Sequence, residues 1–257
     1  MKRSLVILAN RILGVVGLRL IRAESQEDVE SAFHSWHYLR HNSRRLEHLA
    51  SLALPVSGKT VLELGAGIGD HSSFYIDRGC KITITDSRAE NIKYVERRYP
   101  GCDAYQLDLE DESFPGKIDK QYDVIHCYGL LYHLSNPEFV IRQLAGFCKE
   151  MMVLETAVSF GAEEENYQVK EDPTNPSQAM SGTGSRPTRP WLFALLKKHF
   201  KHVYMPLTQP VHEEFPVDWS THDKSEREVR AVFICSNTAL ESPLLSEDLT
   251  NTQTRQI

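Results

Sequence analysis

A glycine-rich turn between a predicted strand and a predicted helix constrains the fold of this chain more than any other feature. Residues 60–72 read TVLELGAGIGDHS, and residues 61–64 are mostly apolar and β-prone, as in a strand buried on both faces of a parallel sheet. Glycines at positions 65, 67 and 69 let the backbone turn tightly and let a ligand approach without a Cβ in the way. Helical spacing then follows as far as Gly79. A strand, a glycine turn and a helix N-terminus predict a site for a polar ligand group at the carboxyl edge of a sheet.

The spacing of the glycines indicates which ligand binds there. A dinucleotide site needs G-x-G-x-x-G, so that the third glycine packs helix on strand beneath a pyrophosphate. Here the spacing is G-x-G-x-G, and Glu63 stands two residues before the first glycine. A carboxylate at this point favours a ligand with an ammonium group and repels a pyrophosphate. The turn resembles motif I of the class I S-adenosylmethionine-dependent methyltransferases, whose usual form is close to V-L-E-x-G-x-G-x-G.

The resemblance covers roughly residues 58–237 and implies an α/β fold with S-adenosylmethionine as cofactor. The expected architecture is Rossmann-like: a seven-stranded, mostly parallel sheet with an antiparallel seventh strand and flanking helices. Alternation of strand and helix along the chain favours such a doubly wound sheet. After the strand at 61–64, the pattern predicts strands at 81–85, 104–107, 122–127, 151–159, 202–205 and 230–236, and helices at 91–99, from 137 onward and at 191–200.

Acidic residues follow two of the predicted strands. Asp86 ends the second strand about twenty residues past the glycines, where a carboxylate can accept both hydroxyls of a ribose. The resemblance implies that Asp108, after the third strand, accepts the adenine amino group and that the next backbone amide contacts a ring nitrogen. The expected cofactor-binding residues are Glu63, Gly65, Ala66, Gly67, Gly69, Asp86, Ser87, Asp108, Leu109, Cys127 and Tyr128.

The loop after the fourth strand, YGLLYHLSNP, is similar to that of small-molecule and wobble-uridine-modifying methyltransferases, where it meets the acceptor. The methyl carbon is already activated, so the enzyme must align a nucleophile with it, and an alcohol also needs a base. His133 is the predicted base because imidazole titrates near neutrality. A role limited to holding the loop by hydrogen bonds remains open. The expected substrate-binding residues are Tyr132, His37, His41, Arg186, Arg189 and His222.

Three further segments carry expectations. Residues 24–54 are predicted to be helical, with His34, His37, His41 and His48 on one stripe but no acid or cysteine to complete a metal site. A polar helix beside a substrate cleft, with no metal, is therefore expected. Residues 160–190 lack periodicity and are either a lid over the acceptor site or a disordered insertion. The polar residues from 238 onward are expected to be a frayed tail.

The composition limits which binding partners and which cellular compartment are expected. The 257 residues carry a formal net charge of −6, which argues against a nucleic-acid partner recognised by bulk electrostatics. Five widely spaced cysteines predict free thiols in a reducing cytoplasm. Residues 1–22 are basic and free of acids, but Arg11 interrupts the apolar run. They are expected to contact the inner membrane surface or to pack on the domain or on a partner subunit.

The chain is therefore divided into a basic and helical extension (1–57), a methyltransferase domain with the lid (58–237) and a polar tail (238–257), and is expected to be a monomer or a homodimer. The leading function is methyl transfer to a small-molecule acceptor, a hydroxyl of a sugar or secondary metabolite. The stretches YLRHNSRRLEHL and GSRPTRPWLF resemble a bacterial subgroup associated with glycan or secondary-metabolite tailoring. The alternatives are an RNA-modifying methyltransferase and a noncatalytic partner subunit with the cofactor fold.

Overall fold

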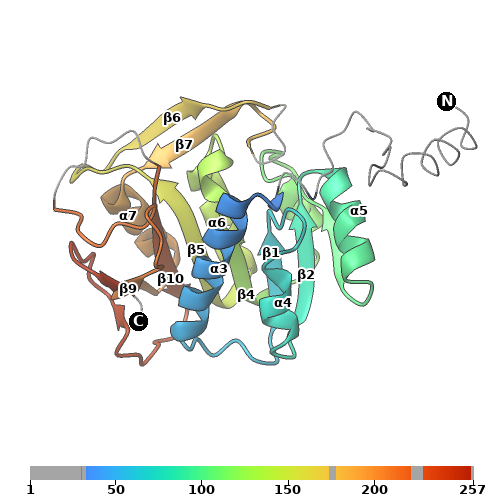
Figure 1. The fold of residues 1–257 in the computed structure, drawn as a ribbon, viewed down its shortest axis with the longest axis horizontal. Helices are drawn as coiled ribbons and strands as arrows, with labels where there is room; N and C mark the ends of the chain where they lie inside the picture. Colours follow the sequence, from blue (N-terminus) through green and yellow to red (C-terminus); the bar gives the residue numbers. More distant parts are fainter. Residues whose placement is uncertain (1–29, 31–32, 174–177, 221–227, 256–257) are drawn as a thin grey trace, which may run out of the picture.

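A single large sheet organises the computed structural model, which describes residues 30, 33–173, 178–220 and 228–255. Its strand order is β11-β8-β10-β5-β4-β1-β2-β3 (Figure 1). β1 pairs in parallel with β2 and β4, β2 with β3, and β4 with β5, whereas β10 runs antiparallel to β5 and β8. The strands are β1 (Thr60–Leu64), β2 (Lys81–Asp86), β3 (Asp103–Gln106), β4 (Tyr122–Tyr128), β5 (Cys148–Val158), β8 (His202–Pro206), β10 (Val229–Ser236) and β11 (Leu245–Ser246).

The predicted Rossmann-like sheet and its antiparallel strand are thus confirmed, with one difference. The two-residue strand β11 pairs antiparallel with β8 and makes the sheet eight-stranded rather than seven-stranded. Periodicity could not predict it, because two residues are too few to show an alternation.

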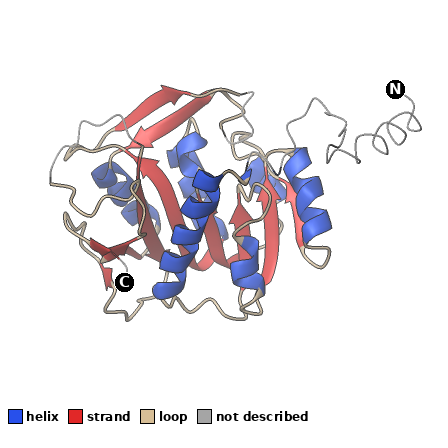
Figure 2. Cartoon of the chain, in the orientation of Figure 1, coloured by secondary structure: helices blue, strands red, loops and turns tan. Residues whose placement is uncertain are grey.

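Helices cover both faces of the sheet, as the cartoon in Figure 2 shows. They are α3 (Trp36–Ser51), α4 (Ser72–Ile76), α5 (Ala89–Arg98), α6 (Pro137–Phe147) and α7 (Arg189–His199), with 3-10 turns η2 (Phe114–Lys117) and η3 (Leu131–His133). Side chains of one hydrophobic cluster come from α3, α4 and α5, and those of the other from α6 and α7. Successive residues of β5 alternate between the two clusters, Met151 in one and Met152 in the other, because neighbouring strand residues face opposite ways.

Side-chain caps set where three of the helices begin. The Asn136 side chain accepts a hydrogen bond from the amide of Phe139 at the start of α6, and Thr188 does the same at the start of α7. Ser35 caps α3, so this helix begins at Trp36 rather than continuing from residue 24 as predicted. Residues 1–29 lie outside the described part, and the expectations for the basic segment 1–22 stay predictions. In the described ranges, no helix has the length and apolar character needed to cross a membrane.

The segment predicted as a structureless lid contains a β-hairpin. β6 (Asn166–Lys170) pairs antiparallel with β7 (Thr183–Pro187), while residues 174–177 between them are not described. The hairpin lies directly against η3, since a Cβ on Gly184 would come within 2.5 Å of the carbonyl oxygen of Tyr132. The prediction of an irregular segment is therefore wrong for these strands. The hairpin lies beside η3, where an element that covers the cavity would have to lie.

The C-terminal residues are bound to the domain as far as Arg255, so the expected frayed tail is also wrong. β12 (Thr254–Arg255) pairs with β9 (Thr208–Gln209). The Gln253 side chain is buried, donates to the carbonyl of Pro206 over 2.6 Å and accepts from Gln209 and Trp219. Paired buried amides cannot be recognised in a polar sequence, because their partners are about 35–45 residues away.

A buried ionic triad fastens α3 to the sheet. Glu155 of β5 is fully buried and bonds to the guanidinium groups of Arg45, from α3, and Arg230, from β10. The Arg230 contact is 3.2 Å, and Arg45 also donates to Asn42 over 3.1 Å. Because all three charged side chains lie out of water, the loss of one partner leaves the rest poorly compensated.

Replacing Arg45 should therefore destabilise the fold strongly. We expect Arg45→Met to lower the free energy of unfolding by about 3–5 kcal/mol, measured by denaturant titration. The matched control is Arg44→Met on the same helix, whose ion pair with Glu47 is exposed and should be worth less than ~1 kcal/mol. Equal losses in the two variants would contradict a structural role for the triad.

Candidate functional site

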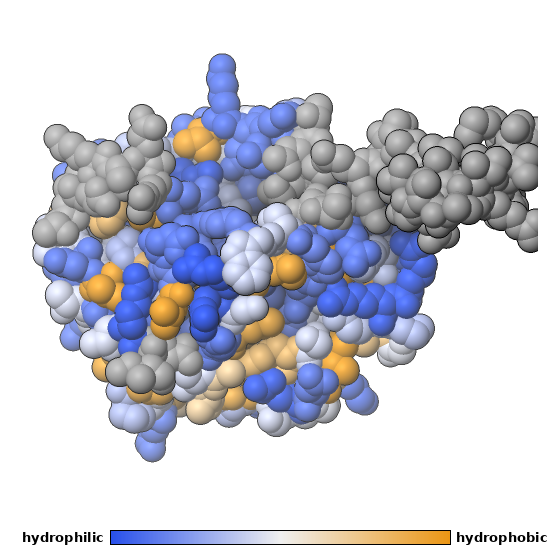
Figure 3. All heavy atoms as spheres, viewed as in Figure 1, coloured by the Kyte–Doolittle hydropathy of each residue, from blue (hydrophilic) through white to orange (hydrophobic). Residues whose placement is uncertain are grey.

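A cavity of about 480 Å³ opens at the carboxyl ends of β1, β2 and β4. Its wall combines the glycine turn, α3, η3, the β6–β7 hairpin and the start of β10. The face of the molecule that α3 crosses is mostly hydrophilic, with hydrophobic residues scattered over it (Figure 3). Eleven of the predicted site residues line this cavity, namely the predicted base His133 and the predicted binding residues Gly65, Gly67, Asp86, Ser87, Asp108, Leu109, His37, His41, Tyr132 and Arg186.

The glycine turn is shaped for a close approach. Gly65 and Gly67 have φ angles of 60° and 56°, in the left-handed region that favours glycine. A Cβ on Gly65 would lie 2.8 Å from Leu130, and a Cβ on Gly67 would lie 2.9 Å from Phe33. Both positions therefore exclude other residues on conformational and steric grounds.

Asp86 stands at the end of β2, as predicted, but much of its hydrogen-bonding capacity is already used. Its Oδ2 accepts from the amide of Gly67 over 2.8 Å, and its Oδ1 accepts from the amide of Arg88 and from Asn91, each over 2.9 Å. A carboxylate offers about four lone-pair directions, so one remains. This is fewer than the two ribose hydroxyls expected from the sequence. Asp108 lines the cavity farther along and accepts from the amide of Glu110 over 3.0 Å.

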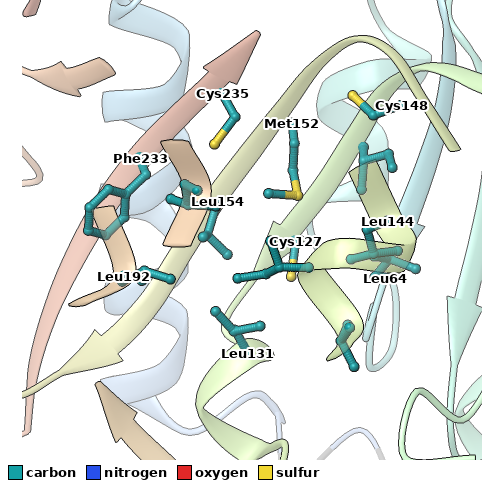
Figure 4. Close-up of a cluster of buried hydrophobic side chains, with 14 of the residues drawn as sticks. Leu64, Cys127, Leu131, Leu144, Cys148, Met152, Leu154, Leu192, Phe233 and Cys235 are labelled. Carbon is teal, nitrogen blue, oxygen red and sulfur yellow. The ribbon is translucent and has the colours of Figure 1, made fainter. Parts of the chain in front are cut away.

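Five of the predicted cofactor residues do not line the large cavity. Glu63, Ala66 and Tyr128 line a second, smaller cavity of about 60 Å³ beneath it. The carbonyl of Gly69 accepts from the hydroxyl of Tyr99. Cys127 points into the hydrophobic core among Leu131, Met152 and Leu154 (Figure 4), which corrects its assignment to the cofactor.

Burial controls the charge of Glu63. Loss of hydration raises its pKa from 4.5 to about 7, although the hydroxyl of Ser72 donates to its Oε2 and acts in the opposite direction. The folded pKa lies above the unfolded one, so the proton stabilises the fold. That stabilisation is complete below pH 4.5 and is lost as the pH rises through 7.

Glu63→Gln should retain this stabilisation at every pH, because its side chain never ionises. At pH 8 we expect the variant to exceed wild type in free energy of unfolding by up to about 3 kcal/mol, and at pH 4 to differ little. Denaturant titrations at both pH values measure this. The exposed Glu96 supplies the control, since Glu96→Gln should show no such divergence. A constant difference between wild type and Glu63→Gln across this range would refute the assignment.

His133, the predicted base, lines the cavity beside the β6–β7 hairpin and pairs with a residue that the sequence did not indicate. Its Nδ1 is 2.5 Å from Oε2 of Glu171, which follows β6 in the hairpin. Burial opposes the charge on Glu171, but the hydrogen bond from His133 lowers the pKa of this carboxyl below its ordinary value. Arg186 donates to Glu171 over 3.4 Å and to the carbonyl of Tyr132 over 3.1 Å.

Arg230, Glu214 and Glu228 complete this wall, and none of the three was singled out as a site residue from the sequence. Arg230 donates through Nε to Glu214 over 2.8 Å, and through its Nη atoms to Glu155, to Glu228 and to the hydroxyl of Tyr132. The one sequence signal was a charged residue at the start of an otherwise apolar strand, RAVFICS. A buried charge at that position predicts that Arg230 has an oppositely charged partner, but it does not indicate which residue the partner is.

Two predicted substrate residues are not placed in the cavity. Arg189 begins α7, lies over the ring of Trp219 at 4.1 Å and donates to the carbonyl of Thr250 over 2.6 Å. Burial lowers its pKa to about 9. This arginine fastens the C-terminal segment and is corrected to a structural role. His222 lies outside the described residues.

The histidine stripe on α3 meets an acid that the helix itself does not supply. Nε2 of His37 is 3.1 Å from Oε1 of Glu214, and Nε2 of His41 is 3.5 Å from Oε2 of the same residue. The ring of His212 packs between them, with centroids 5.5 Å from His37 and 4.9 Å from His41. Burial lowers the pKa of His41 far below its ordinary value and also lowers that of His212. Of the remaining stripe, His34 approaches Asp70 and His48 bonds to Thr208.

Comparison with known proteins identifies this arrangement. A family model described as "Methyltransferase domain" matches residues 35–204, which is more than half of the chain. The chain belongs to this methyltransferase family. The match includes the glycine turn, both strand-end aspartates and η3, and the family assignment from the sequence is confirmed.

Curated relatives match only in part. The ubiquinone biosynthesis O-methyltransferase of Klebsiella pneumoniae subsp. pneumoniae is 30% identical over 125 residues, 48% of this chain and 50% of that protein. The same enzyme of Bordetella avium is 28% identical over 124 residues, 48% of this chain and 51% of that protein. The chain thus spans about half the length of the curated relatives it matches.

Solved structures share the fold across nearly the whole chain. The N-terminal domain of EvdMO1, crystallised in the presence of SAH and D-fucose, has a TM-score of 0.58 at 18% identity and covers 92% of this chain and 97% of that one. Magnesium protoporphyrin IX methyltransferase (ChlM) from Synechocystis PCC 6803, with bound SAM, has a TM-score of 0.51 at 12% identity and covers 91% and 96%. At such identities, the likeness shows the fold alone.

S-adenosylmethionine is confirmed as the cofactor of the family, and the large cavity fits it. Gly65 and Gly67 line it with their backbone, and Asp86 keeps an acceptor direction for a hydroxyl. Asp108 and Leu109, which were expected to contact the adenine, line the same cavity. Glu63, in the smaller cavity, is the exception.

Loss of either aspartate should weaken cofactor binding without unfolding the protein. We expect Asp86→Ala and Asp108→Ala each to reduce affinity for S-adenosylmethionine by roughly thirty- to a hundred-fold, or about 2–3 kcal/mol, because each removes a charged hydrogen-bond acceptor. Calorimetric titration measures the loss. The surface acid Asp111, which pairs with Lys117, gives the control Asp111→Ala. Folded variants that bind as tightly as wild type would show that the assigned strand ends do not contact the cofactor.

Proposed function

We propose that this protein methylates a hydroxyl group of a small, polar, multiply hydroxylated molecule, with His133 as the base. The observation that carries the proposal is the pairing of His133 Nδ1 with Glu171 inside the same cavity as the glycine turn. A hydrogen bond from Nδ1–H to the carboxylate fixes the tautomer that leaves the lone pair on Nε2. A proton acceptor of this kind is what an alcohol, but not an amine, requires.

Each part of the wall has a task in this reaction. The chemistry supplied by the bound cofactor is a methyl group already activated by a sulfonium. Glu171 orients the imidazole of His133 and stabilises the positive charge that it gains on taking the hydroxyl proton. The hairpin that carries Glu171 packs on η3 and shields this pair from water.

The charges of the cavity support a polar acceptor. Among the described residues that line it, six are acidic (Asp86, Asp108, Glu110, Glu171, Glu214, Glu228) and four are basic (Arg88, Lys170, Arg186, Arg230). Closely spaced donors and acceptors suit several hydroxyl groups on one molecule. The balance opposes the RNA-modifying alternative, which needs a basic groove for phosphates. In the same direction, one structure of similar fold was crystallised with a sugar, D-fucose.

The acceptor can be found by mass spectrometry of cell extracts incubated with isotopically labelled S-adenosylmethionine. A labelled product with a new methyl ether would support the proposal. Label in RNA, or no transfer by a protein that binds the cofactor, would support the respective alternatives.

With an acceptor in hand, His133→Ala should lower the turnover rate by about 10²–10⁴-fold while cofactor affinity stays nearly unchanged. The pH–rate profile should also lose the limb due to the imidazole. His133→Asn is the matched variant, because its amide can keep the hydrogen bond to Glu171 but cannot take a proton. If His133→Asn works as well as wild type, the histidine only holds the loop.

A further inference from the structure

At the mouth of the cavity, three imidazoles surround one carboxylate. His37 and His41 are four residues apart on α3 and so lie on the same face of this helix, and His212 and Glu214 come from the loop after β9. One ligand atom each from His37, His212 and Glu214 can be chosen so that all three lie within 4.8 Å of one another. The Nε2 atom of His212 has no hydrogen-bond partner among the described residues, and that of His37 contacts only Glu214 by hydrogen bond.

The distances approach those of a metal site. Two ligands about 2.0–2.1 Å from a tetrahedral zinc ion lie about 3.3 Å apart. His37 Nε2 and Glu214 Oε1 are 3.1 Å apart, close to this value. The other separations are at most 4.8 Å, and the one between His37 and His212 can shorten by rotation of the His37 side chain, 62% of which is exposed.

Two buried nitrogens of the cluster have no hydrogen-bond partner among the described residues. They are Nε2 of His41 and Nε2 of His212, and both residues are at least 95% buried. His41 Nε2 is directed at the carboxylate of Glu214, 3.5 Å away. Buried polar atoms in proteins usually have a partner, and these two ring nitrogens lie beside the same carboxylate and are free to bind a ligand.

The Glu214 carboxylate accepts a hydrogen bond of the kind that metal-bound carboxylates usually accept from neighbouring residues. Oε2 of Glu214 accepts from Nε of Arg230 over 2.8 Å, and the amide of Arg230 donates to the Glu214 carbonyl over 2.7 Å. Oε1 is left toward His37. A hydrogen bond such as this one from Arg230, made by a residue that does not itself bind the metal, fixes the orientation of a ligating carboxylate.

His212 must change its tautomer to take part. Its Nδ1 accepts from the amide of Glu214 over 3.3 Å, which places the ring proton on Nε2. A cation at Nε2 moves that proton to Nδ1 and breaks this long, weak hydrogen bond.

We propose that His37, His212 and Glu214 bind a divalent transition-metal cation, with His41 as the fourth nitrogen beside it. Imidazole nitrogens with one carboxylate suit zinc and its neighbours in the first transition row, whereas magnesium and calcium prefer oxygen ligands. The site takes Zn²⁺ in preference to Mg²⁺.

Because His37, His41 and Glu214 also line the large cavity, the cation faces the acceptor. It would bind an oxygen of the acceptor and so select hydroxylated molecules, a role that rests on the proposed function. Cation binding itself does not depend on that role.

A second cluster, Glu63, His71 and His126, has similar spacing but does not qualify. His71 Nδ1 meets His126 Nε2 at 3.2 Å, and the remaining ring nitrogens meet Asn42 and Tyr75. All four nitrogens are thus engaged with one another or with neighbouring side chains. A cation there would have to displace this network.

The test is calorimetric titration of the metal-free full-length protein with Zn²⁺ and, separately, Mg²⁺. We expect one Zn²⁺ per chain and no saturable Mg²⁺ binding. His37→Ala should weaken Zn²⁺ binding at least tenfold, and because this side chain is largely exposed, the variant should fold normally. Co²⁺ provides an independent readout, since its absorption spectrum reports tetrahedral nitrogen and oxygen ligation.

Two controls make the result decisive. His202 also pairs with a glutamate, Glu247, over 2.8 Å, but at the edge of the sheet, so His202→Ala should leave Zn²⁺ binding unchanged. Cys80 and Cys102 are partly exposed, and all titrations are repeated with both replaced by serine. The proposal is overturned if wild type takes up no Zn²⁺, if His37→Ala binds as tightly as wild type, or if the cysteine replacements abolish binding.

Binding and function can fail separately. If Zn²⁺ binds as expected but the identified acceptor lacks a hydroxyl that is methylated, the proposed function is wrong and the metal site stands. If methyl transfer to a hydroxyl is found but Zn²⁺ does not bind, the metal site is wrong and the function stands.

Discussion

The ion triad of Arg45, Glu155 and Arg230 is the contact on which the rest of the site depends. A fully buried carboxylate must be paired, and two guanidinium groups satisfy it from opposite directions. One comes from α3 and the other from β10, so the helix that closes the cavity is held to the sheet by charge as well as by apolar packing. Arg45 also lies against Gly129, where a Cβ would come within 2.8 Å of its Nη2, so the loop after β4 has to pass beneath the guanidinium as glycine.

From this triad, paired charges continue to the acceptor side. Arg230 shares Glu228 with Arg186, and Arg186 shares Glu171 with His133. Each carboxylate is bonded to two positive or proton-donating groups, which limits how far any one side chain can move alone. The position of His133 is therefore set partly by a carboxylate in the core of the sheet. Such a chain explains how a loop and a hairpin can hold the proposed base in a fixed position.

The residues expected to bind the cofactor could be predicted from the sequence because each lies in, or next to, a strand that the sequence pattern itself predicts. The glycine turn follows its own strand, and Asp86 and Asp108 each stand at or just beyond the end of a strand, so alternation and spacing sufficed. The acceptor side is assembled from distant segments: Arg45 and Glu155 are 110 residues apart, and His37 and Glu214 are 177. No local pattern encodes such pairs. The β6–β7 hairpin was not predicted for a different reason: β6 is largely exposed and shows no alternation of apolar and polar residues.

Because one half of the cavity is built from neighbouring residues and the other from distant segments, the two halves differ in how easily sequence changes can alter them. A site made from one turn and two strand ends persists as long as the sheet does, which suits a cofactor common to a whole family. A site made from a helix, a hairpin and a loop can be rebuilt by changes in any one of them, while the buried triad keeps the frame in place. The histidine stripe on α3 illustrates this point. On the helix alone it lacked an acid, and a separate loop brings His212 and Glu214 to His37, so that one ligand atom of each lies within 4.8 Å of the others. The side chains that surround α3 in this cavity are therefore determined by which loops meet the helix, and not by the strand ends and glycine turn on the other side.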